Sequence, residues 1–451
     1  MSGPKVIRIV TREEIIAICE GHLARLHVAV EEWIKIGRRN DTLTDAEVSA
    51  TLARQEALRL MLAQDRFAEL QKDVPDEIAF LRADQEERLV RASSARAKAR
   101  TAQRQTQDAA ASILSALEKR EVPADLRAAL EDAAAGRSDG AAVISQAFAL
   151  LSEKKVPAVS DHQRRLADAL KDSDDRQSFN EWLASQPTIT DDEGFARLNQ
   201  RIAELAVILG EAATTEFEDR LRRLSSSESL PHRSLLMDSL EVDLAQAVAR
   251  AKERTALQSR LRMLAAELSQ LASENSTSVS QSIVEQIDDP SEMLIELEKE
   301  AAMVLDRIRE EAAAKSRRHA ILKGLTDLGY QVTESLETAW VRDGKVVIKR
   351  ASQPGYGVEI GGKVESGRVQ MRTVAFRQAN APPDTARDRD AETIFCGDVT
   401  RLKEQFADAG GGIVIERAMP IGATPLRVVA ETSATDTEEL QGRVTDRIRW
   451  K

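Results

Sequence analysis

Aromatic residues are scarce in this chain. They make up 3% of its 451 residues, whereas apolar residues reach 42% and charged residues 31%. Because aromatic side chains dominate thick globular cores, this composition favours long helices that pack along narrow apolar stripes. The chain is also too long for one ordinary domain. We therefore expect several units, most of them helical.

Cysteines and long apolar runs are also rare. Cys19 and Cys396 are the only cysteines, and their wide separation gives no disulfide framework, which fits a reducing compartment. No apolar run approaches the ~18 residues that a membrane-spanning helix requires. The apolar segment 6–10 is too short, and is interrupted by charge too soon, to be a signal peptide. The sequence therefore predicts a cytoplasmic protein with no membrane segment.

Histidine is absent beyond residue 319. The end of the chain therefore lacks the residue needed for a histidine-based triad or a histidine-ligated metal site. Cys19 and His22 stand three residues apart, a spacing that can ligate zinc, but no second pair lies nearby and Cys19 falls on an apolar seam. Helical core is the better interpretation. No glycine cluster stands between a strand and a helix start as a phosphate loop requires, so we expect no cofactor.

The sequence up to residue 318 has the periodicity of long helices. Apolar residues recur at alternating spacings of three and four, the pattern of helices that pack against other helices. Capping boxes predict three helix starts, at Thr11 with Glu14, Thr44 with Glu47 and Thr190 with Glu193.

Polar and special residues divide these helices. Pro75 restarts the chain into a third long helix, and residues 273–282 form a polar linker. Asp289 caps the helix that follows the linker. The basic residues 315–318 break this helix, and its second part ends at Gly329. We expect these breaks to separate shorter helices.

The composition changes after residue 318. Fourteen of the 21 glycines lie there, and the helical seam stops. Short runs separated by tight turns predict an antiparallel meander. Strands are expected at 5–10, 330–332, 337–341, 345–350, 357–360, 368–376, 413–416 and 426–429, and a helix at 390–409. The first of these strands would pair with a sheet elsewhere in the chain. The predicted fold is mainly α, with long helical or coiled-coil arms followed by a small C-terminal α+β domain with an antiparallel sheet.

These changes also set the predicted domain boundaries. The expected units are an N-terminal helical hairpin and long helix at 1–122, a short-helix elbow module at 123–189, long coiled-coil helices at 190–318, the α+β domain at 319–433, and an acidic tether with a short C-terminal helix at 434–451.

Three carboxylates near the start of the predicted C-terminal helix are the sharpest catalytic candidates. Asp388, Asp390 and Glu392 alternate with arginines and could hold a divalent metal beside a phosphate. The alternative is an acidic helix N-terminus that is favoured by the helix dipole, with the arginines pairing locally. We favour the alternative, and therefore predict no catalytic residue and no metal.

A basic stripe is the main candidate for binding nucleic acid. Arg96, Arg100 and Arg104 recur every four residues in a stretch without acids, and they could contact phosphates. No aromatic residue is interspersed to stack on bases, and the net charge of −11 disfavours a nucleic-acid binder overall. A solvated face, or a face against an acidic helix, is the favoured interpretation.

These observations lead to a functional hypothesis. We expect a non-enzymatic cytoplasmic scaffold or adaptor, whose helical arms self-associate or hold protein partners and whose α+β domain binds a partner. Trp340, Tyr356 and Phe376 are the candidates for that surface, with sheet core as the alternative role for at least two of them. A second hypothesis is a nucleic-acid-binding protein with a metal-dependent phosphodiesterase-like site. A third is an accessory subunit whose coil regulates a separate ATPase.

Overall fold

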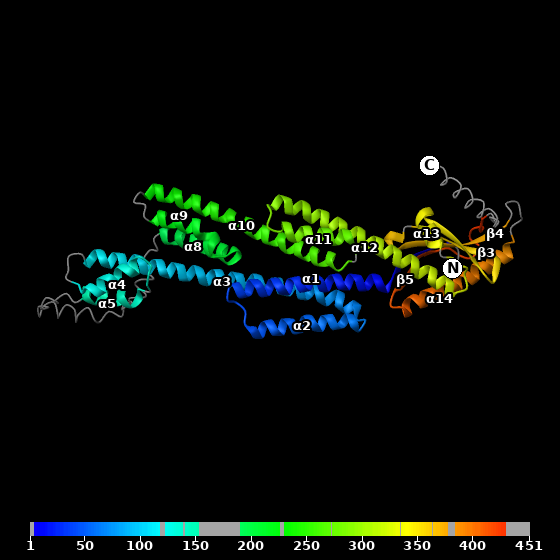
Figure 1. The fold of residues 1–451 in the computed structure, drawn as a ribbon, viewed down its shortest axis with the longest axis horizontal. Coiled ribbons are helices and arrows are strands. Elements are labelled where there is room, and N and C mark those ends of the chain that lie inside the picture. Colours follow the sequence, from blue (N-terminus) through cyan, green and yellow to red (C-terminus); the bar gives the residue numbers. More distant parts are fainter. Residues whose placement is uncertain are drawn as a thin grey trace, which may run out of the picture. The chain divides into compact units, whose positions relative to one another are not determined.

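The computed structural model describes residues 4–117, 122–138, 140–152, 190–225, 230–271, 273–333, 335–362, 364–377 and 384–429. The chain is mainly α, and its long helices precede a C-terminal region with an antiparallel sheet, which confirms the predicted fold class (Figure 1). Residues 153–189 of the predicted elbow and the predicted tether at 434–451 lie outside the described residues.

The chain divides into two compact units. The first comprises Met1–Glu31, Ser49–Ala79 and Gln258–Lys451, and the second comprises Glu32–Val48 and Phe80–Leu257. The helices up to residue 327 are α1 (Arg12–Arg39), α2 (Asp45–Ala63), α3 (Phe67–Leu117), α4 (Ala124–Ala134), α5 (Ala141–Ser152), α8 (Thr190–Leu209), η2 (Glu211–Thr214), α9 (Thr215–Ser225), α10 (Leu230–Ser269), α11 (Glu274–Gln286) and α12 (Ser291–Asp327). None of the described helices combines the length and apolar character that crossing a bilayer demands.

Helix α3 runs through Pro75, so the predicted restart at this residue is wrong. A proline inside a helix costs about 3 kcal/mol, because it removes a hydrogen bond and its ring crowds the preceding turn. Leu70 and Val74, just before the proline, are both fully buried. Their packing offsets the cost of the proline.

Two further predicted breaks are also wrong. Helix α12 is continuous through residues 315–318, where Arg317 is buried. The predicted linker at 273–282 lies almost entirely in α11, with Val279 buried. In both places a polar sequence is helical because a few of its positions pack against neighbouring elements.

The ends of α12 show one wrong and one confirmed prediction. Pro290, rather than Asp289, is the residue at the cap position, and no side chain caps this end. The predicted end at Gly329 is confirmed, because this residue has a φ of 86°. The Tyr330 amide then donates a hydrogen bond back to the Leu325 carbonyl at 3.0 Å. Glycine adopts this left-handed conformation without a Cβ penalty.

The sheet belongs to the first unit and includes the N-terminal strand. Its strands are β1 (Lys5–Val10), β2 (Lys345–Arg350), β3 (Gln353–Gly361), β4 (Arg368–Phe376), β5 (Gly412–Ala418) and β6 (Arg427–Val429). Their order is β2-β3-β4-β1-β5, with β6 parallel to the end of β4. Strand β1 pairs antiparallel with β4 on one side and with β5 on the other. The expected strand at 5–10 is therefore confirmed, and it is an interior strand of the sheet.

Two short predicted strands are wrong. Residues 337–341 lie in helix α13 (Ser335–Asp343), in which Trp340 is buried. The apolar spacing of Leu336, Ala339 and Trp340 is that of a helix face, and all three pack in the core. Residues 330–332 form no strand; Tyr330 makes only an isolated bridge to Arg350.

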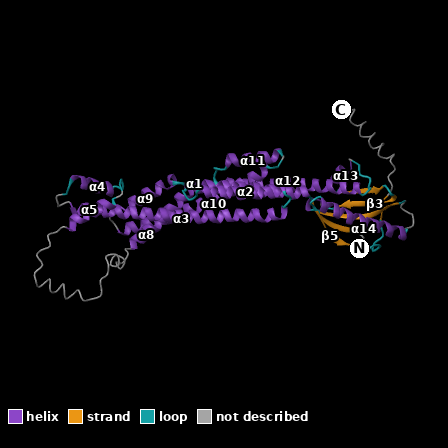
Figure 2. Ribbon diagram, turned by 90° about the horizontal axis from the view of Figure 1, so that it is seen from below, coloured by secondary structure: helices purple, strands orange, loops and turns teal. Residues whose placement is uncertain are grey.

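The core of the first unit lies between one face of the sheet and the helices α12, α13 and α14 (Thr385–Asp408), which Figure 2 shows beside the strands. Helix α14 starts five residues before the predicted position, where the Asp384 carboxylate accepts a hydrogen bond from the Arg387 amide at 3.2 Å. The core includes Ile7, Ile9, Ile321, Leu325, Trp340, Ile348, Ile360, Met371, Phe395 and Leu402.

A polar cluster joins α1, α2 and α3 within the second unit. The Trp33 indole donates to Asp84 at 2.7 Å, and Arg88 pairs with both Asp84 and Glu47 at 2.6 Å. Glu47 and Thr44 also form the predicted capping box. Hydrogen bonds from Arg88 and then Thr44 lower the pKa of Glu47 to about 2. This carboxylate is therefore ionised throughout the neutral range and holds the start of α2.

Candidate functional site

The two faces of the sheet differ in composition. Side chains alternate between the faces along each strand, and directly paired residues share a face. One face packs in the helical core. The other, which we call the open face, carries many more basic than acidic side chains. The charged residues at these alternate positions are Arg8, Lys345, Lys349, Arg368, Arg372, Arg417 and Arg427, together with Glu359. Glu416 lies at the irregularity in the register between β1 and β5, where it pairs with Arg368 of this face.

Glu359 is at the centre of one group on the open face. Only 7% of this residue is exposed. Arg372 on the neighbouring strand donates to it at 2.9 Å, and Arg427 donates to its second oxygen at 2.7 Å. A carboxylate bound by two guanidiniums in this way keeps its charge and fixes both arginines. This group therefore holds strands β3, β4 and β6 together.

The rest of the open face has fewer internal partners. Arg8 lies directly opposite Arg368 in the register between β1 and β4. Arg368 pairs with Glu416 at 2.9 Å. Arg417 and Lys345 are exposed. Among the hydrogen bonds and ion pairs of the described residues, none joins Arg8 or Arg417 to a carboxylate, and the positive charge of Lys345 helps to lower the pKa of Asp343. We call Arg8, Lys345, Arg368 and Arg417 the basic face.

The base of the helices carries a second buried cluster. Arg317 on α12 bonds both carboxylate oxygens of Glu14, on the first turn of α1. Its Nη1 donates to the carbonyls of Val364 and Glu365 at 2.8 Å, in the short helix η3 (Val364–Ser366). Arg317 therefore ties the starting turn of α1, the last turns of α12 and the sheet region together.

Asp398 on α14 forms another buried group. It accepts hydrogen bonds from the Tyr330 hydroxyl at 2.8 Å and from Arg350 at 2.7 Å. Burial first, and the charge of Asp398 second, raise the pKa of Tyr330 above its ordinary value. The hydroxyl is therefore a permanent donor at physiological pH, which is a structural role and not an acid–base one.

The three candidate carboxylates, for which the acidic helix start was the favoured interpretation, do not converge. Asp388 accepts from the Tyr356 hydroxyl at 2.9 Å and pairs with Arg377. Glu392 is buried and accepts from the Gly422 amide at 2.6 Å. Asp390 is exposed on α14. Within the described ranges, no group of three histidine, cysteine or acidic residues is placed to hold a metal. Two of the three candidates thus contribute to contacts within the fold.

The predicted basic stripe faces acids of its own unit. Arg96 and Arg100 both pair with Glu211, at 3.4 and 2.9 Å. Arg100 also pairs with Glu218 at 2.7 Å. The Arg104 guanidinium lies 4.1 Å from the centre of the Phe195 ring, a cation–π geometry. These contacts are those of the favoured interpretation, in which the stripe faces an acidic helical segment.

The three aromatic candidates for a partner surface occupy different positions. Trp340 is 2% exposed and belongs to the core. Tyr356 is half-buried and bonds Asp388. Phe376 is half-buried on the open face, with the Lys349 ammonium 4.7 Å from the centre of its ring. Of the three, only Phe376 lies on the open face.

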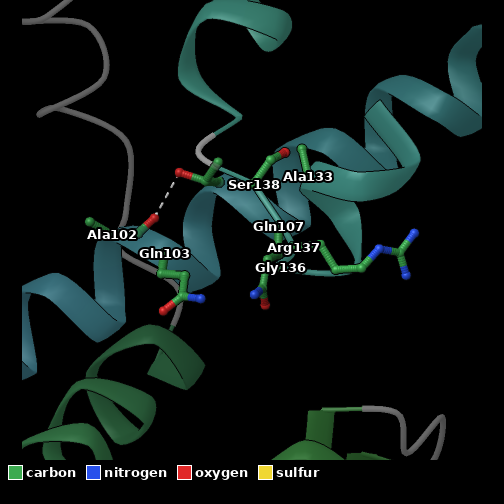
Figure 3. A pocket seen from close by; sticks show the side chains of 8 residues that line it. Ala102, Gln103, Gln107, Ala133, Gly136, Arg137 and Ser138 are labelled. Atoms are coloured by element: carbon green, nitrogen blue, oxygen red, sulfur yellow. Dashed lines mark hydrogen bonds between the residues drawn. The ribbon is translucent and has the colours of Figure 1, made fainter. Parts of the chain in front are cut away.

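A hollow of about 460 Å³ lies in the second unit, between α3 and the turn after α4. Figure 3 shows the side chains that line it. Its only charged side chain, Arg137, pairs with Asp132 at 2.6 Å. The hollow therefore offers no free acid or base for chemistry. Its lining residues are Ala102, Gln103, Thr106, Gln107, Ala133, Gly136, Arg137 and Ser138.

Cys19 and His22 lie in the helical part of the first unit. Cys19 is fully buried, as a core residue would be. Near His22, the carboxylate of Glu267 pairs with Arg25 at 2.6 Å and with Arg309 at 2.5 Å. Burial first, and the two arginines second, lower the pKa of His22. Protonation of this histidine is therefore less favourable in the folded protein than in the unfolded chain.

The lowered pKa of His22 predicts a loss of stability in mild acid. As the pH falls through about 6.5, His22 binds a proton more readily in the unfolded state than in the folded state. The free energy of unfolding therefore falls. Urea unfolding of the wild type at about pH 7.5 and about pH 5.5 measures this difference. His22→Gln should reduce the difference. Equal pH dependence of the wild type and the variant would contradict the prediction.

Comparison of the chain with protein-family models, with curated proteins and with solved structures gives no match. The fold, the open face of the sheet and the basic face within it are therefore the basis for inferring function. Sequence reasoning missed the basic face, because its residues come from four strands that are far apart in the chain. The one available signal was the alternation of residues 5–10, which places Arg8 opposite the apolar side of that strand.

Proposed function

We propose that this protein is a non-enzymatic scaffold or adaptor, in which helical arms assemble with other chains and the sheet region binds a partner. The observation that carries the proposal is the topology of the first unit. The chain leaves the sheet after β1 and returns to it at β2, so all the described helices from α1 to α13 are inserted between two strands of one sheet. This arrangement suits a molecule whose helices determine where a binding domain is held.

The tie at the base of the helices supports this proposal. Arg317 joins α1 and α12 to η3 beside the sheet. The hydroxyl of Thr11, just before α1, adds a hydrogen bond of 2.8 Å with the hydroxyl of Ser316 on α12. A buried, multiply bonded arginine restricts rotation more than an exposed ion pair does. The helices would therefore transmit their position to the sheet.

Exposed apolar side chains on the helices support assembly. Leu52 and Leu60 on α2 are 46% and 51% exposed. They lie eight residues apart, which places them near one face of the helix. Apolar residues arranged in this way fit an interface between helices, and we take a second copy of this chain as the occupant to test.

Sedimentation velocity over a range of protein concentrations tests this proposal. The wild type should show concentration-dependent association. The double substitution Leu52→Glu and Leu60→Glu should weaken association by roughly tenfold or more, because charge replaces apolar contact area. Leu52→Met with Leu60→Met is the matched control and should retain association, since it keeps the apolar surface. A wild type that remains monomeric at every concentration would count against assembly through the arms.

A further inference from the structure

The charges of the open face are unevenly compensated. Outside the basic face, Glu359 compensates Arg372 and Arg427, and Lys349 lies against Phe376. Among the described residues of the basic face, Arg368 pairs with Glu416, and Lys345 has the charge of Asp343 nearby. This leaves a concentration of positive charge on one side of a chain whose net charge is −11.

The register sets two of these charges directly against each other. Arg8 on β1 and Arg368 on β4 are paired residues. Like charges at directly paired positions of a sheet destabilise it. An anion lying across both strands would remove that cost, so the arrangement suits a face that is occupied by an anionic partner.

The spacing of the charges indicates an extended partner. Lys345 lies on β2, three strands away from Arg8 on β1. Strands lie about 4.8 Å apart, so roughly 14 Å separates these two positions across the sheet. Such groups do not converge on one small anion. A chain of regularly spaced negative charges can reach several of them at once.

The side chains of the open face favour one class of extended anionic partner over another. Single-stranded nucleic acids are bound by aromatic side chains that stack on bases. Phe376 is the only aromatic residue on the described part of the open face, and it is half-buried with the Lys349 ammonium over its ring. Arginines and a lysine without stacking groups are suited to backbone phosphates, which are exposed along a duplex.

We propose that the basic face binds the phosphate backbone of a nucleic-acid duplex through Arg8, Lys345, Arg368 and Arg417. The contact is made to the phosphates and does not read sequence. This inference names the partner of the sheet in the proposed function, and rests on that function only in using the sheet as the binding surface. DNA and RNA duplexes share the phosphate chemistry and are separate arms of the test.

The test uses the full chain and fluorescence anisotropy with labelled DNA and RNA duplexes. We expect at least one of the two duplexes to bind at low salt. A plot of log affinity against log salt concentration should have a slope of about −3, which corresponds to three or four phosphate contacts. Arg8→Gln with Arg417→Gln should weaken binding about tenfold or more and make the slope shallower by about 2. Glu416→Gln should strengthen binding a few-fold, because it releases Arg368.

The control removes equal charge on α14, which packs on the opposite face. Arg401→Gln with Lys403→Gln should change the affinity by less than about twofold. Thermal unfolding of each variant shows whether it is folded. The tighter duplex binding that we expect from Glu416→Gln could not result from misfolding, because misfolding would weaken binding. Absence of saturable binding to either duplex, or equal weakening by the control, would overturn the proposal.

A polyglutamate peptide provides the remaining arm. Tighter binding of this peptide than of either duplex, sensitive to Arg8 and Arg417, would assign the face to an acidic protein and overturn the nucleic-acid proposal. Self-association measured by sedimentation is independent of all these results. Failure of this inference and failure of the proposed assembly can therefore be distinguished.

Discussion

Replacing Ile7 and Ile9 with alanine should lower the free energy of unfolding of the first unit by about 5 kcal/mol or more. Both side chains are 0% exposed and lie in the core under the interior strand β1. Each truncation removes buried methyl groups and leaves a cavity at the centre of the sheet. Urea unfolding gives the total effect, and amide hydrogen exchange locates it, with loss of protection expected in β4 and β5.

Arg8→Ala is the matched control on the same strand. Arg8 is exposed on the open face, so its removal should change stability by less than about 0.5 kcal/mol. Unchanged exchange in β4 and β5 of the double isoleucine variant would contradict the observed topology. The same topology predicts that a fragment starting at residue 319 does not fold, because it lacks the strand that pairs with both β4 and β5.

Arg317→Met should cost about 3–5 kcal/mol of stability, the second largest effect we expect. The Arg317 side chain is 8% exposed, and its removal leaves Glu14 and the carbonyls of Val364 and Glu365 without their donor. A carboxylate that is 16% exposed, as Glu14 is, keeps most of its desolvation cost when it loses the partner that attracts it. Thermal or urea unfolding of the full chain measures the loss.

Lys315→Met, at an exposed position of the same helix, is the control and should have little effect. Combining Arg317→Met with Glu14→Leu should cost less than the sum of the two single changes, because the second change removes the unpaired charge. Strictly additive effects would show that the pair does not couple, and would contradict the proposed tie at the base of α1 and α12.

The helical seams and most strands could be predicted from the sequence, because they depend on local periodicity. The buried positions of α12, Leu294, Leu297, Ala301 and Val304, follow the predicted alternation of three and four. Strand β4 has the predicted bounds. The turn at Gly329 follows from the conformational freedom of glycine alone.

The errors are concentrated where long-range packing outweighs a local signal. Pro75 and the basic residues 315–318 have the sequence pattern of helix breaks. Both lie inside continuous helices, because residues beside them in the sequence are buried against other elements. Trp340 was expected on a strand, and its burial with Leu336 stabilises a helix instead. Local preferences differ by about 1 kcal/mol or less at most residues, which the burial of one large side chain exceeds.

The candidate site was less accessible from the sequence than the fold. Asp388 and Glu392 stand close together in the sequence and look like an acidic cluster. In the structure, Asp388 contacts Tyr356 and Arg377, whereas Glu392 accepts from the Gly422 amide. The basic face shows the reverse case. Its members are unremarkable singly, and only the order of the strands brings them together.

By itself, the sequence determined most of the long helices and most of the strands, since hydrophobic periodicity and turn residues act over a few positions. Only the tertiary structure decided the partners. Glu14, which caps α1 in the sequence pattern, gives its carboxylate to Arg317, about three hundred residues away. Strand β1 likewise takes its place between β4 and β5. Such choices depend on which surfaces meet when the chain closes on itself, and no local pattern carries that information.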